Sequence, residues 1–242
     1  MAKSKMIGIS GVARKIPKQY IGVANVARKG KAEWIGANGV SRQFWAGGTP
    51  ISSKAEGSIV QVKENGALVD FYVAKHNYES GLNGAGRTLL VRKNGYDSRQ
   101  WHSSNVNAYA SSSIDTWLNG TYKAMLNSDV QTAVGTTKLY YTPGNGTTTV
   151  SQLSRAVFLV SQKEVGGNVA YANSEGTALS IADTLRGLGS AQWLRSPSIN
   201  NKTQACFVNA SGFVNAGNCS VSYYSRPCFT VPGDFAIEDL AN

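Results

Sequence analysis

The first 45 residues carry a pattern of apolar and polar positions that recurs three times. The segments MIGISGVARK, YIGVANVARK and WIGANGVSRQ align without gaps at a period of 14 residues. Each segment centres on a turn-forming dipeptide with apolar residues on both sides, which predicts a short β-hairpin. A two-stranded hairpin of this size is only marginally stable in water. We therefore expect the repeats to pack on each other, on identical chains or on a larger assembly.

The pattern changes after these repeats. Residues 46–56 (AGGTPISSKAE) have the composition of a linker, so we expect a basic N-terminal module at residues 1–54 and a main domain at residues 55–242. The main domain opens with two apolar runs joined by Asn65-Gly66, which predicts a hairpin over residues 57–76. A further strand is expected at residues 87–93.

One apolar stripe predicts a helix over residues 111–124. Its members fall at helical spacing and are Ile114, Trp117, Leu118, Tyr122, Met125 and Leu126. Ser113 is the expected N-cap, and Asp115 lies in the first turn, where the helix dipole favours an acid. Asn119-Gly120 is expected to break or bend this helix, and a second short helix is expected at residues 129–134.

The C-terminal part predicts mostly strands. Residues 155–160 (RAVFLV) indicate a buried strand, and further strands are expected around Trp193, Tyr223 and Phe229. Between them, residues 206–217 predict a hairpin that turns at residues 210–212. Helices that precede antiparallel strands, without alternating βα units, indicate an α+β fold and not a doubly wound parallel sheet.

Charge separates the two parts of the chain. Residues 1–54 contain ten Lys or Arg and one acid, whereas the other 188 residues contain 14 basic and 13 acidic side chains. The basic pairs are most simply solvated strand ends, and the alternative is a nucleic-acid binder whose affinity falls steeply with added salt. The N-terminus lacks the apolar core of a secretory signal, and no run of 18 apolar residues predicts a membrane span.

No catalytic or cofactor motif is recognisable. The sequence has no phosphate-binding Gly-rich loop, no metal-binding His or Cys spacing and no Gly-x-Ser-x-Gly turn, so we predict no cofactor, no metal and no enzyme activity. His76 and His102 are interpreted as structural or exposed polar residues. The three cysteines, Cys206, Cys219 and Cys228, form neither a disulfide framework nor a zinc site on sequence grounds.

Residues 198–225 form an unusual segment in which Lys202 is the only charged residue. Its Asn, Ser, Gly and Tyr content is typical of adaptable binding surfaces, in which Tyr gives contact area and Ser or Asn gives hydrogen bonds. Val208, Val214 and Val221 are expected to anchor successive strands while their neighbours face outward. The simpler interpretation is a polar surface with no specific partner.

Residues on both sides of this segment, and at intervals within it, resemble those of a known family. They are Trp193-Leu194-Arg195-Ser196-Pro197, Ala205, Val208, Gly212, Val214, Val221, Arg226-Pro227 and Phe229. This pattern resembles the C-terminal variable region of proteins diversified by retroelements, some of which are receptor binders at phage tail tips. The resemblance implies a C-type-lectin fold with a variable region at about 198–225. Cys228 stands where this family usually has a small residue, and we expect it to act as a small buried hydrophobe.

Two functions of proteins with related folds are not implied by this resemblance. The calcium-binding motif of animal C-type lectins is absent, so calcium-dependent sugar binding is not implied. Formylglycine-generating enzymes share the broader fold, but they need a reactive cysteine pair, and Cys206 and Cys219 lie in the segment that would be variable. We therefore favour binding over catalysis.

The resemblance implies a non-enzymatic receptor-binding protein. Its expected binding face comprises Ile199, Asn200, Asn201, Cys206, Phe207, Asn209, Phe213, Asn215, Asn218, Cys219, Tyr223 and Tyr224. The expected partners are a protein or glycan of the host cell surface and, through the N-terminal repeats, phage tail proteins, in a homo-oligomer for which a trimer is the guess. The expected location is the virion, or the bacterial cytoplasm where the chain is made. The rival hypothesis is a structural tail or surface component with a fixed lectin-like domain.

Overall fold

A computed structural model describes residues 49–167 and 171–237 in full, together with the backbone of six strands between residues 6 and 46. The chain divides into two compact units, Met1–Gly48 and Thr49–Asn242. The boundary expected at residue 54 is therefore wrong. Thr49 and Pro50 pair with Ile237 and Ala236, and Ile51 is fully buried, so residues 49–56 belong to the second unit instead of a linker.

The first unit contains three antiparallel hairpins. Its strands are β1 (Met6–Ile9), β2 (Val12–Lys15), β3 (Tyr20–Val23), β4 (Val26–Lys29), β5 (Ala32–Ala37) and β6 (Val40–Ala46). In the first hairpin Met6 pairs with Lys15, and in the second Tyr20 pairs with Lys29, so equivalent positions are paired. The third hairpin is longer and contains a register shift between Glu33 and Trp34.

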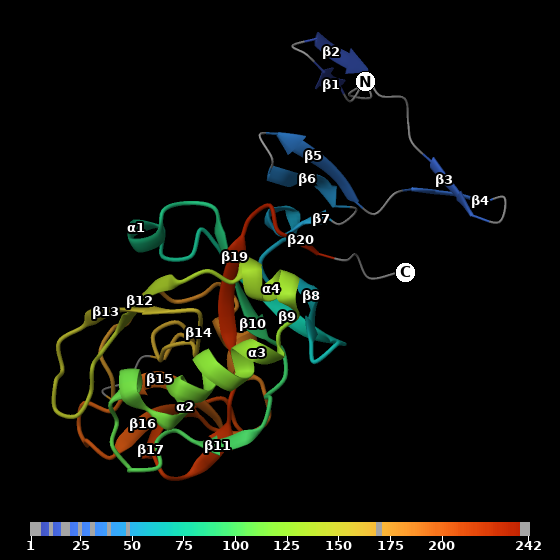
Figure 1. Ribbon diagram of the computed structural model, residues 1–242. Coiled ribbons are helices and arrows are strands. Elements are labelled where there is room, and N and C mark those ends of the chain that lie inside the picture. The colour runs from blue at the N-terminus through green and yellow to red at the C-terminus, as the bar shows by residue number, and fades with distance from the viewer. Residues whose placement is uncertain are drawn as a thin grey trace. The chain divides into compact units, whose positions relative to one another are not determined.

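The second unit is built mainly from strands (Figure 1). They are β7 (Thr49–Pro50), β8 (Ile59–Glu64), β9 (Ala67–His76), β10 (Arg87–Arg92), β11 (Ser98–Gln100), β12 (Thr137–Tyr141), β13 (Ser151–Arg155), β14 (Val157–Phe158), β15 (Gln192–Pro197), β16 (Gln204–Val208), β17 (Val214–Asn218), β18 (Ser222–Tyr224), β19 (Cys228–Pro232) and β20 (Ala236–Ile237). Two five-stranded sheets have the orders β14-β19-β10-β9-β8 and β11-β18-β15-β16-β17. Both are antiparallel except where β15 runs parallel to β18.

Short helices complete the second unit. They are η1 (Ile51–Ser53), α1 (Ser80–Asn83), η2 (Tyr109–Ser111), α2 (Ser113–Trp117), η3 (Leu118–Tyr122), α3 (Lys123–Met125), α4 (Ser128–Ala133) and α5 (Ala182–Arg186). The chain is thus a mixed α+β protein, as predicted. In the described ranges no helix combines the length and apolar character that crossing a membrane requires.

The β8–β9 hairpin forms where the sequence predicts it. Asn65 and Gly66 both have positive φ angles, 50° and 78°, which suits the tight turns that match the twist of paired strands. Next along the sheet, β10 is apolar without alternation because both of its faces are covered. Leu90 joins one hydrophobic cluster, whereas Leu89 and Val91 join the other.

The predicted helix forms as α2, η3 and α3 in succession. Its N-cap is Ser112, whose Oγ accepts a hydrogen bond from the backbone N of Asp115 at 3.1 Å, so the expectation of Ser113 is wrong by one residue. The bend expected at Asn119-Gly120 takes the form of the wide π-helical turn η3. Asn119 Nδ2 donates to Val157 O at 2.9 Å, and this bond ties the turn to β14.

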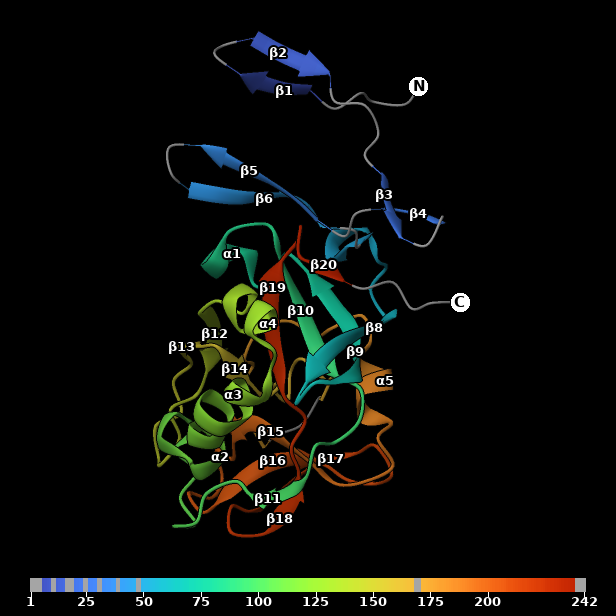
Figure 2. The ribbon, with the colours of Figure 1, turned by 45° about the vertical axis from the view of Figure 1, so that its right-hand side comes forward.

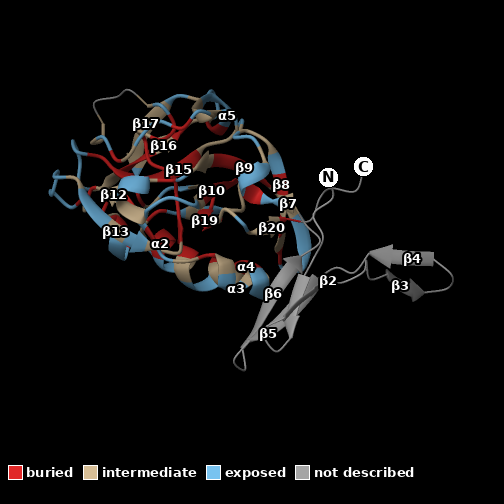
Figure 3. Cartoon of the chain, turned by 90° about the horizontal axis from the view of Figure 1, so that it is seen from above, coloured by how far each residue is buried: buried red, intermediate tan, exposed pale blue. Residues whose placement is uncertain are grey.

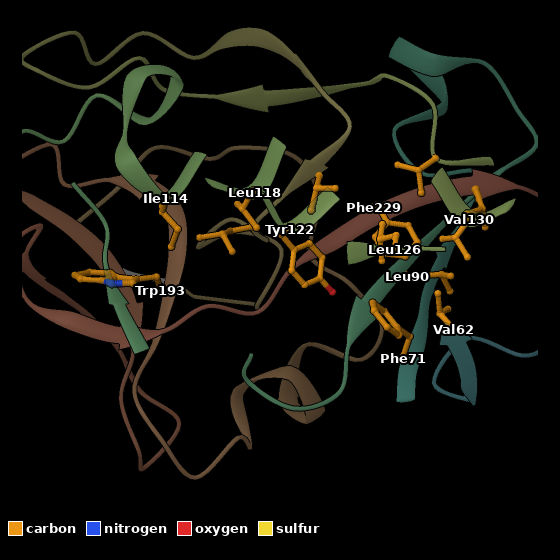
Figure 4. Packing of buried hydrophobic residues seen from close by; sticks show 14 of the residues in the cluster. Val62, Phe71, Leu90, Ile114, Leu118, Tyr122, Leu126, Val130, Trp193 and Phe229 are labelled. Atoms are coloured by element: carbon orange, nitrogen blue, oxygen red, sulfur yellow. The ribbon is translucent and has the colours of Figure 1, made fainter. Parts of the chain in front are cut away.

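The apolar stripe of this helix covers one face of the first sheet. Ile114, Leu118 and Tyr122 point into the same cluster as Phe71 of β9 and Phe229 of β19 (Figure 4). Burial of this kind is the main contribution to stability. Figure 3 shows the buried residues gathered along β10, β15 and β19 inside the second unit.

Candidate functional site

The two ends of the uncharged segment form a buried frame. Every residue from Gln192 to Ser198 and from Ser225 to Val231 is buried. Between these two stretches, only Ala205, Cys206, Val208 and Cys219 are buried. The chain therefore enters and leaves the core on two buried strands, β15 and β19, and brings the intervening residues to the surface.

An ion pair without solvent contact anchors β15. Arg195 and Glu164 are both fully buried, and the guanidinium Nη1 and Nη2 lie 2.6 and 2.9 Å from the two carboxylate oxygens. Tyr78 OH donates to the same carboxylate at 2.5 Å. Glu175 lies beside them, and burial raises the pKa of its carboxyl group although Arg195 opposes this shift. Because these groups satisfy each other in an enclosed space, we interpret them as structural.

A second buried arginine anchors the other end of the frame. Arg226 Nε donates to Arg92 O at 2.7 Å, and Nη1 donates to Leu185 O at 2.6 Å. Gln192 Nε2 donates to the same Leu185 carbonyl at 2.7 Å. One helix, α5, is thereby fixed to both β15 and the start of β19.

A single buried side chain holds the β15–β16 turn. Asn107 Nδ2 lies 2.9 Å from Ser198 O, 3.0 Å from Asn201 O and 2.8 Å from Gln204 O. Its Oδ1 accepts a hydrogen bond from Asn145 N at 2.7 Å. The turn at residues 198–204 is therefore tied to the core through its backbone, and residues 199–202 within it are exposed.

Three aromatic rings cluster on one face of the second sheet. Tyr223 lies 4.6 Å from Trp193 and 4.4 Å from Phe207, measured between ring centroids. Trp193 is buried, whereas Phe207 and Tyr223 are partly exposed. Gly217 runs beneath them, and a Cβ added there would lie 3.1 Å from Phe207 Cε1 and 3.4 Å from Tyr223 Cε2. The absence of a side chain at this position leaves room for the two rings.

The structure divides the twelve predicted binding residues by exposure. Ile199, Asn200, Asn201, Phe213, Asn218 and Tyr224 are exposed, and Phe207, Asn209, Asn215 and Tyr223 are partly buried.

The two cysteines among the twelve are fully buried, so their assignment to an exposed face is wrong. Cys206 alternates with Phe207 along β16 and points to the opposite face. Burial raises the pKa of the Cys219 thiol to about 12, and the pKa of Cys206 is also raised, so neither is a reactive thiolate.

Among the expected strand anchors, Val208 is buried, Val214 is partly buried and Val221 is 40% exposed. Val221 therefore lies on the surface, and the expectation that it anchors a strand is wrong. Cys228 is fully buried, as its role as a small hydrophobe requires.

The exposed predicted residues do not meet in one patch. Asn200 lies in the turn before β16 and Phe213 in the turn after it, so the strand separates them by roughly 17 Å. Asn209 is occupied locally, because its Oδ1 accepts hydrogen bonds from the backbone N atoms of Ser211 and Phe213. The exposed residues thus lie mainly in two separate turns, one containing Asn200 and the other Phe213, and the Phe207 and Tyr223 rings form a third group on the sheet.

A hollow of about 570 Å³ lies beside the β16–β17 turn. Phe213 and Val214 form one wall, and Asp183 and Arg186 of α5 form another. The α5 wall could not be predicted from the sequence, because no residue there forms a motif. The glycines at residues 166–167, 187 and 189 were the available signal, since glycine clusters mark places where backbone lies open to a ligand.

Both histidines make hydrogen bonds within the second unit. The His76 ring nitrogens lie 2.9 Å from Thr88 Oγ1 and 2.7 Å from Lys54 O. His102 Nδ1 accepts a hydrogen bond from Ser104 N at 3.1 Å. Within the fully described ranges, no group of three or more His, Cys, Asp or Glu side chains is placed to hold a metal ion.

Residues 85–233 match a family described as a domain of unknown function, DUF6273. The chain belongs to this family. The match begins just before β10 and ends just after β19, so the DUF6273 region contains the buried frame, the exposed segment and the hollow. Searches among curated proteins and among solved structures returned no match. The DUF6273 description names neither an activity nor a ligand, and nothing in these comparisons links the chain to retroelement variable proteins or to C-type lectins.

Proposed function

We propose that the second unit is a ligand-display domain, in which the buried frame presents residues 199–224 to a receptor. The observation that carries this proposal is the distribution of exposed apolar side chains. Six large hydrophobic side chains are exposed in the fully described ranges, and four of them lie in this segment, namely Ile199, Phe213, Val221 and Tyr224. These four side chains do not meet in one patch, but exposed apolar side chains within a segment that contains a single charged residue are a feature of interaction surfaces.

The two ends of the second unit support a display role. Thr49 and Pro50, through which the chain enters this unit, pair with β20 at one end, and β11, β16 and β17 lie at the opposite end (Figures 1 and 2). A domain that the chain enters at one end and that carries the exposed segment at the other suits attachment to a particle. We propose a phage particle, with a protein or glycan of the host surface as receptor.

The finer parts of the proposal concern fold, diversification and assembly. A C-type-lectin-like fold is supported by the order of helices before antiparallel strands. Diversification by a retroelement is supported by the contrast between a buried frame and an exposed insert. The N-terminal hairpins would attach the chain to tail proteins and form an oligomer, and several copies would convert weak single-site binding into useful avidity.

A matched pair of variants tests receptor binding. Fluorescently labelled full-length protein is incubated with a panel of whole bacterial cells of different species. We expect the triple change Ile199→Ser, Val221→Ser and Tyr224→Ser to abolish the binding seen with the unaltered chain. The control is Ile59→Ser with Leu68→Ser, since these two exposed residues lie outside the segment. Equal binding by both variants, or no binding of the unaltered chain to any strain, would overturn the proposal.

Two further measurements test the finer parts. Diversification requires a near-copy of the codons for residues 198–225, differing only at adenines and lying beside a reverse-transcriptase gene. Without such a copy in the genome, the domain has a fixed surface. Light scattering on the full chain tests the oligomer, because a trimer has three times the 25.7 kDa of one chain.

A further inference from the structure

The hollow beside α5 has two walls of different origin. One wall consists of residues 210–214, within the segment proposed to vary, and the other consists of residues 166–167, 183, 186–187 and 189, outside it. Its volume of about 570 Å³ falls within the range of roughly 300–1,000 Å³ that is usual for small-molecule sites. The hollow is therefore large enough for a small ligand and joins a constant wall to a variable one.

The wall at α5 is held in place by hydrogen bonds. The Leu185 carbonyl of α5 accepts hydrogen bonds from Gln192 Nε2 and Arg226 Nη1, at 2.7 and 2.6 Å. Arg186, the next residue, donates from Nη1 to Val165 O and from Nη2 to Asp183 Oδ1. Its guanidinium group is thereby fixed across the wall and paired with a carboxylate.

The variable wall is also held in place. The Phe213 backbone N donates to Asn209 Oδ1 at 2.9 Å, and Asn209 N donates to Phe213 O at 2.8 Å. Gly212 has a φ of +84°, and a Cβ there would contact Arg186 O at 3.6 Å, so the two walls meet at this glycine. Phe213 follows with 69% of its surface exposed, the largest fraction among the exposed large hydrophobics. A fixed backbone thus presents an exposed aromatic ring beside the hollow.

We propose that this hollow binds a neutral sugar residue of a glycan, with the apolar face of the sugar ring stacked on Phe213. An aromatic ring offers a flat apolar surface to the C–H groups of a sugar. The open carboxylate oxygen of Asp183 accepts hydrogen bonds from sugar hydroxyls, and the backbone around Gly187 and Gly189 supplies further polar groups. This inference rests on the proposed display function and assigns a ligand class to one end of the displayed surface.

Charge argues against an anionic ligand such as a phosphate. Arg186 is the only basic side chain among the lining residues, and it donates from Nη1 to Val165 O and from Nη2 to Asp183 Oδ1. Asp183 balances its charge, so the hollow has no net charge to attract an anion. A neutral ligand that carries hydroxyl groups suits such a site, because Asp183 and Ser211 offer acceptors and the ligand brings no charge to be neutralised.

Nuclear magnetic resonance on the full-length chain tests this proposal. The nitrogen-15-labelled protein is titrated with glucose, galactose, mannose and N-acetylglucosamine at millimolar concentrations, with glycerol as a hydroxyl-bearing control that has no ring. We expect at least one sugar to shift the amide signals of Gly167, Gly187, Gly189 and Phe213, and glycerol to leave them unchanged. If none of the four sugars shifts these amides, or if glycerol shifts them equally, the proposal is wrong.

Variants identify the platform. Phe213→Ala should weaken the binding of that sugar about tenfold, which corresponds to the loss of one anchoring side chain. Tyr224→Ala, which removes an exposed aromatic ring elsewhere in the segment, should leave the affinity unchanged. Both residues are exposed, and thermal unfolding of each variant checks that the fold is retained. Equal affinity of the Phe213→Ala variant and the unaltered chain would refute the stacking role.

The cell-binding assay separates this inference from the function on which it rests. If the unaltered chain binds cells and the Ile199, Val221 and Tyr224 triple variant does not, the display function stands even when no sugar enters the hollow. If a sugar enters the hollow but the chain binds no cells, the hollow is a sugar site and the display function fails.

Discussion

Asn107 should determine the stability of the β15–β16 turn out of proportion to its size. The Asn107→Ala change removes the Nδ2 group that lies within 3.0 Å of the carbonyl oxygens of Ser198, Asn201 and Gln204. It also removes the Oδ1 atom that accepts from Asn145 N. The side chain is fully buried, so these hydrogen bonds are shielded from solvent.

The magnitude follows from which partners are left without a hydrogen bond. Gln204 O still accepts from Ser198 N at 2.9 Å, and Asn201 O still accepts from Gln204 N at 3.1 Å. Ser198 O belongs to a residue that is 5% exposed, and it loses its partner, which costs about 1–3 kcal/mol. With about 0.5 kcal/mol for each of the other three contacts, we expect a loss of about 3 kcal/mol.

Urea unfolding followed by tryptophan fluorescence measures this loss. Asn127→Ala is the control, because the Asn127 side chain makes no capping hydrogen bond, and it should change stability by less than about 0.5 kcal/mol. Asn107→Asp separates chemistry from volume. It keeps an acceptor for Asn145 N but points a carboxylate oxygen at three carbonyls, so it should destabilise at least as much as alanine at neutral pH. If both Asn107 variants unfold at the midpoint of the unaltered chain, the clamp does not stabilise the turn.

Substitutions at three other positions should change the stability of the fold. Arg195→Met should cost about 3–5 kcal/mol in urea unfolding, because it leaves the Glu164 carboxylate buried without a counter-charge, and adding Glu164→Gln should recover part of that loss. Burial raises the pKa of Asp115 to about 6, against about 4 for an unfolded Asp, so the folded state favours the protonated form. Its contribution is therefore fully present below pH 4 and is lost as the pH rises to 6, a fall of about 2–3 kcal/mol that Asp115→Asn should remove from the pH profile of stability. Gly217→Val should lower stability by about 1–3 kcal/mol and separate the Phe207 and Tyr223 rings, which near-ultraviolet circular dichroism detects; an unchanged spectrum would contradict the close packing at this glycine.

Local chemistry made several elements predictable. The Asn65-Gly66 turn could be predicted because these two residues tolerate positive φ angles, which is a local property of the dipeptide. The apolar stripe of the helix could also be recognised in the sequence, because one face of the helix is buried and the other is not. What the stripe could not reveal was the π-helical turn, since that turn depends on Asn119 bonding to Val157, far along the sequence.

Alternation failed where a strand is covered on both faces. Along β16, Ala205 and Cys206 point in opposite directions and both are buried, so the pattern could not indicate which neighbour faces outward. The same limit concealed the boundary between the two units. Ile51 is one apolar residue among small polar ones, yet it fills the core, and its backbone N bonds to Phe235 O at the other end of the unit. Such contacts between distant segments have no local signal.

The structure also changes what a diversified surface in this protein can be. Three constraints act inside residues 199–224. Cys206 and Cys219 are enclosed in the core, Gly217 must leave room for two rings, and Gly212 needs a positive φ where the two walls of the hollow meet. A mutational process that wrote freely into these four positions would lose folded protein at each, through overpacking or backbone strain. Random variation is therefore compatible with the fold only where side chains are exposed, as at Phe213. Where such a process rewrites the codon of a buried residue, selection must remove most of the products.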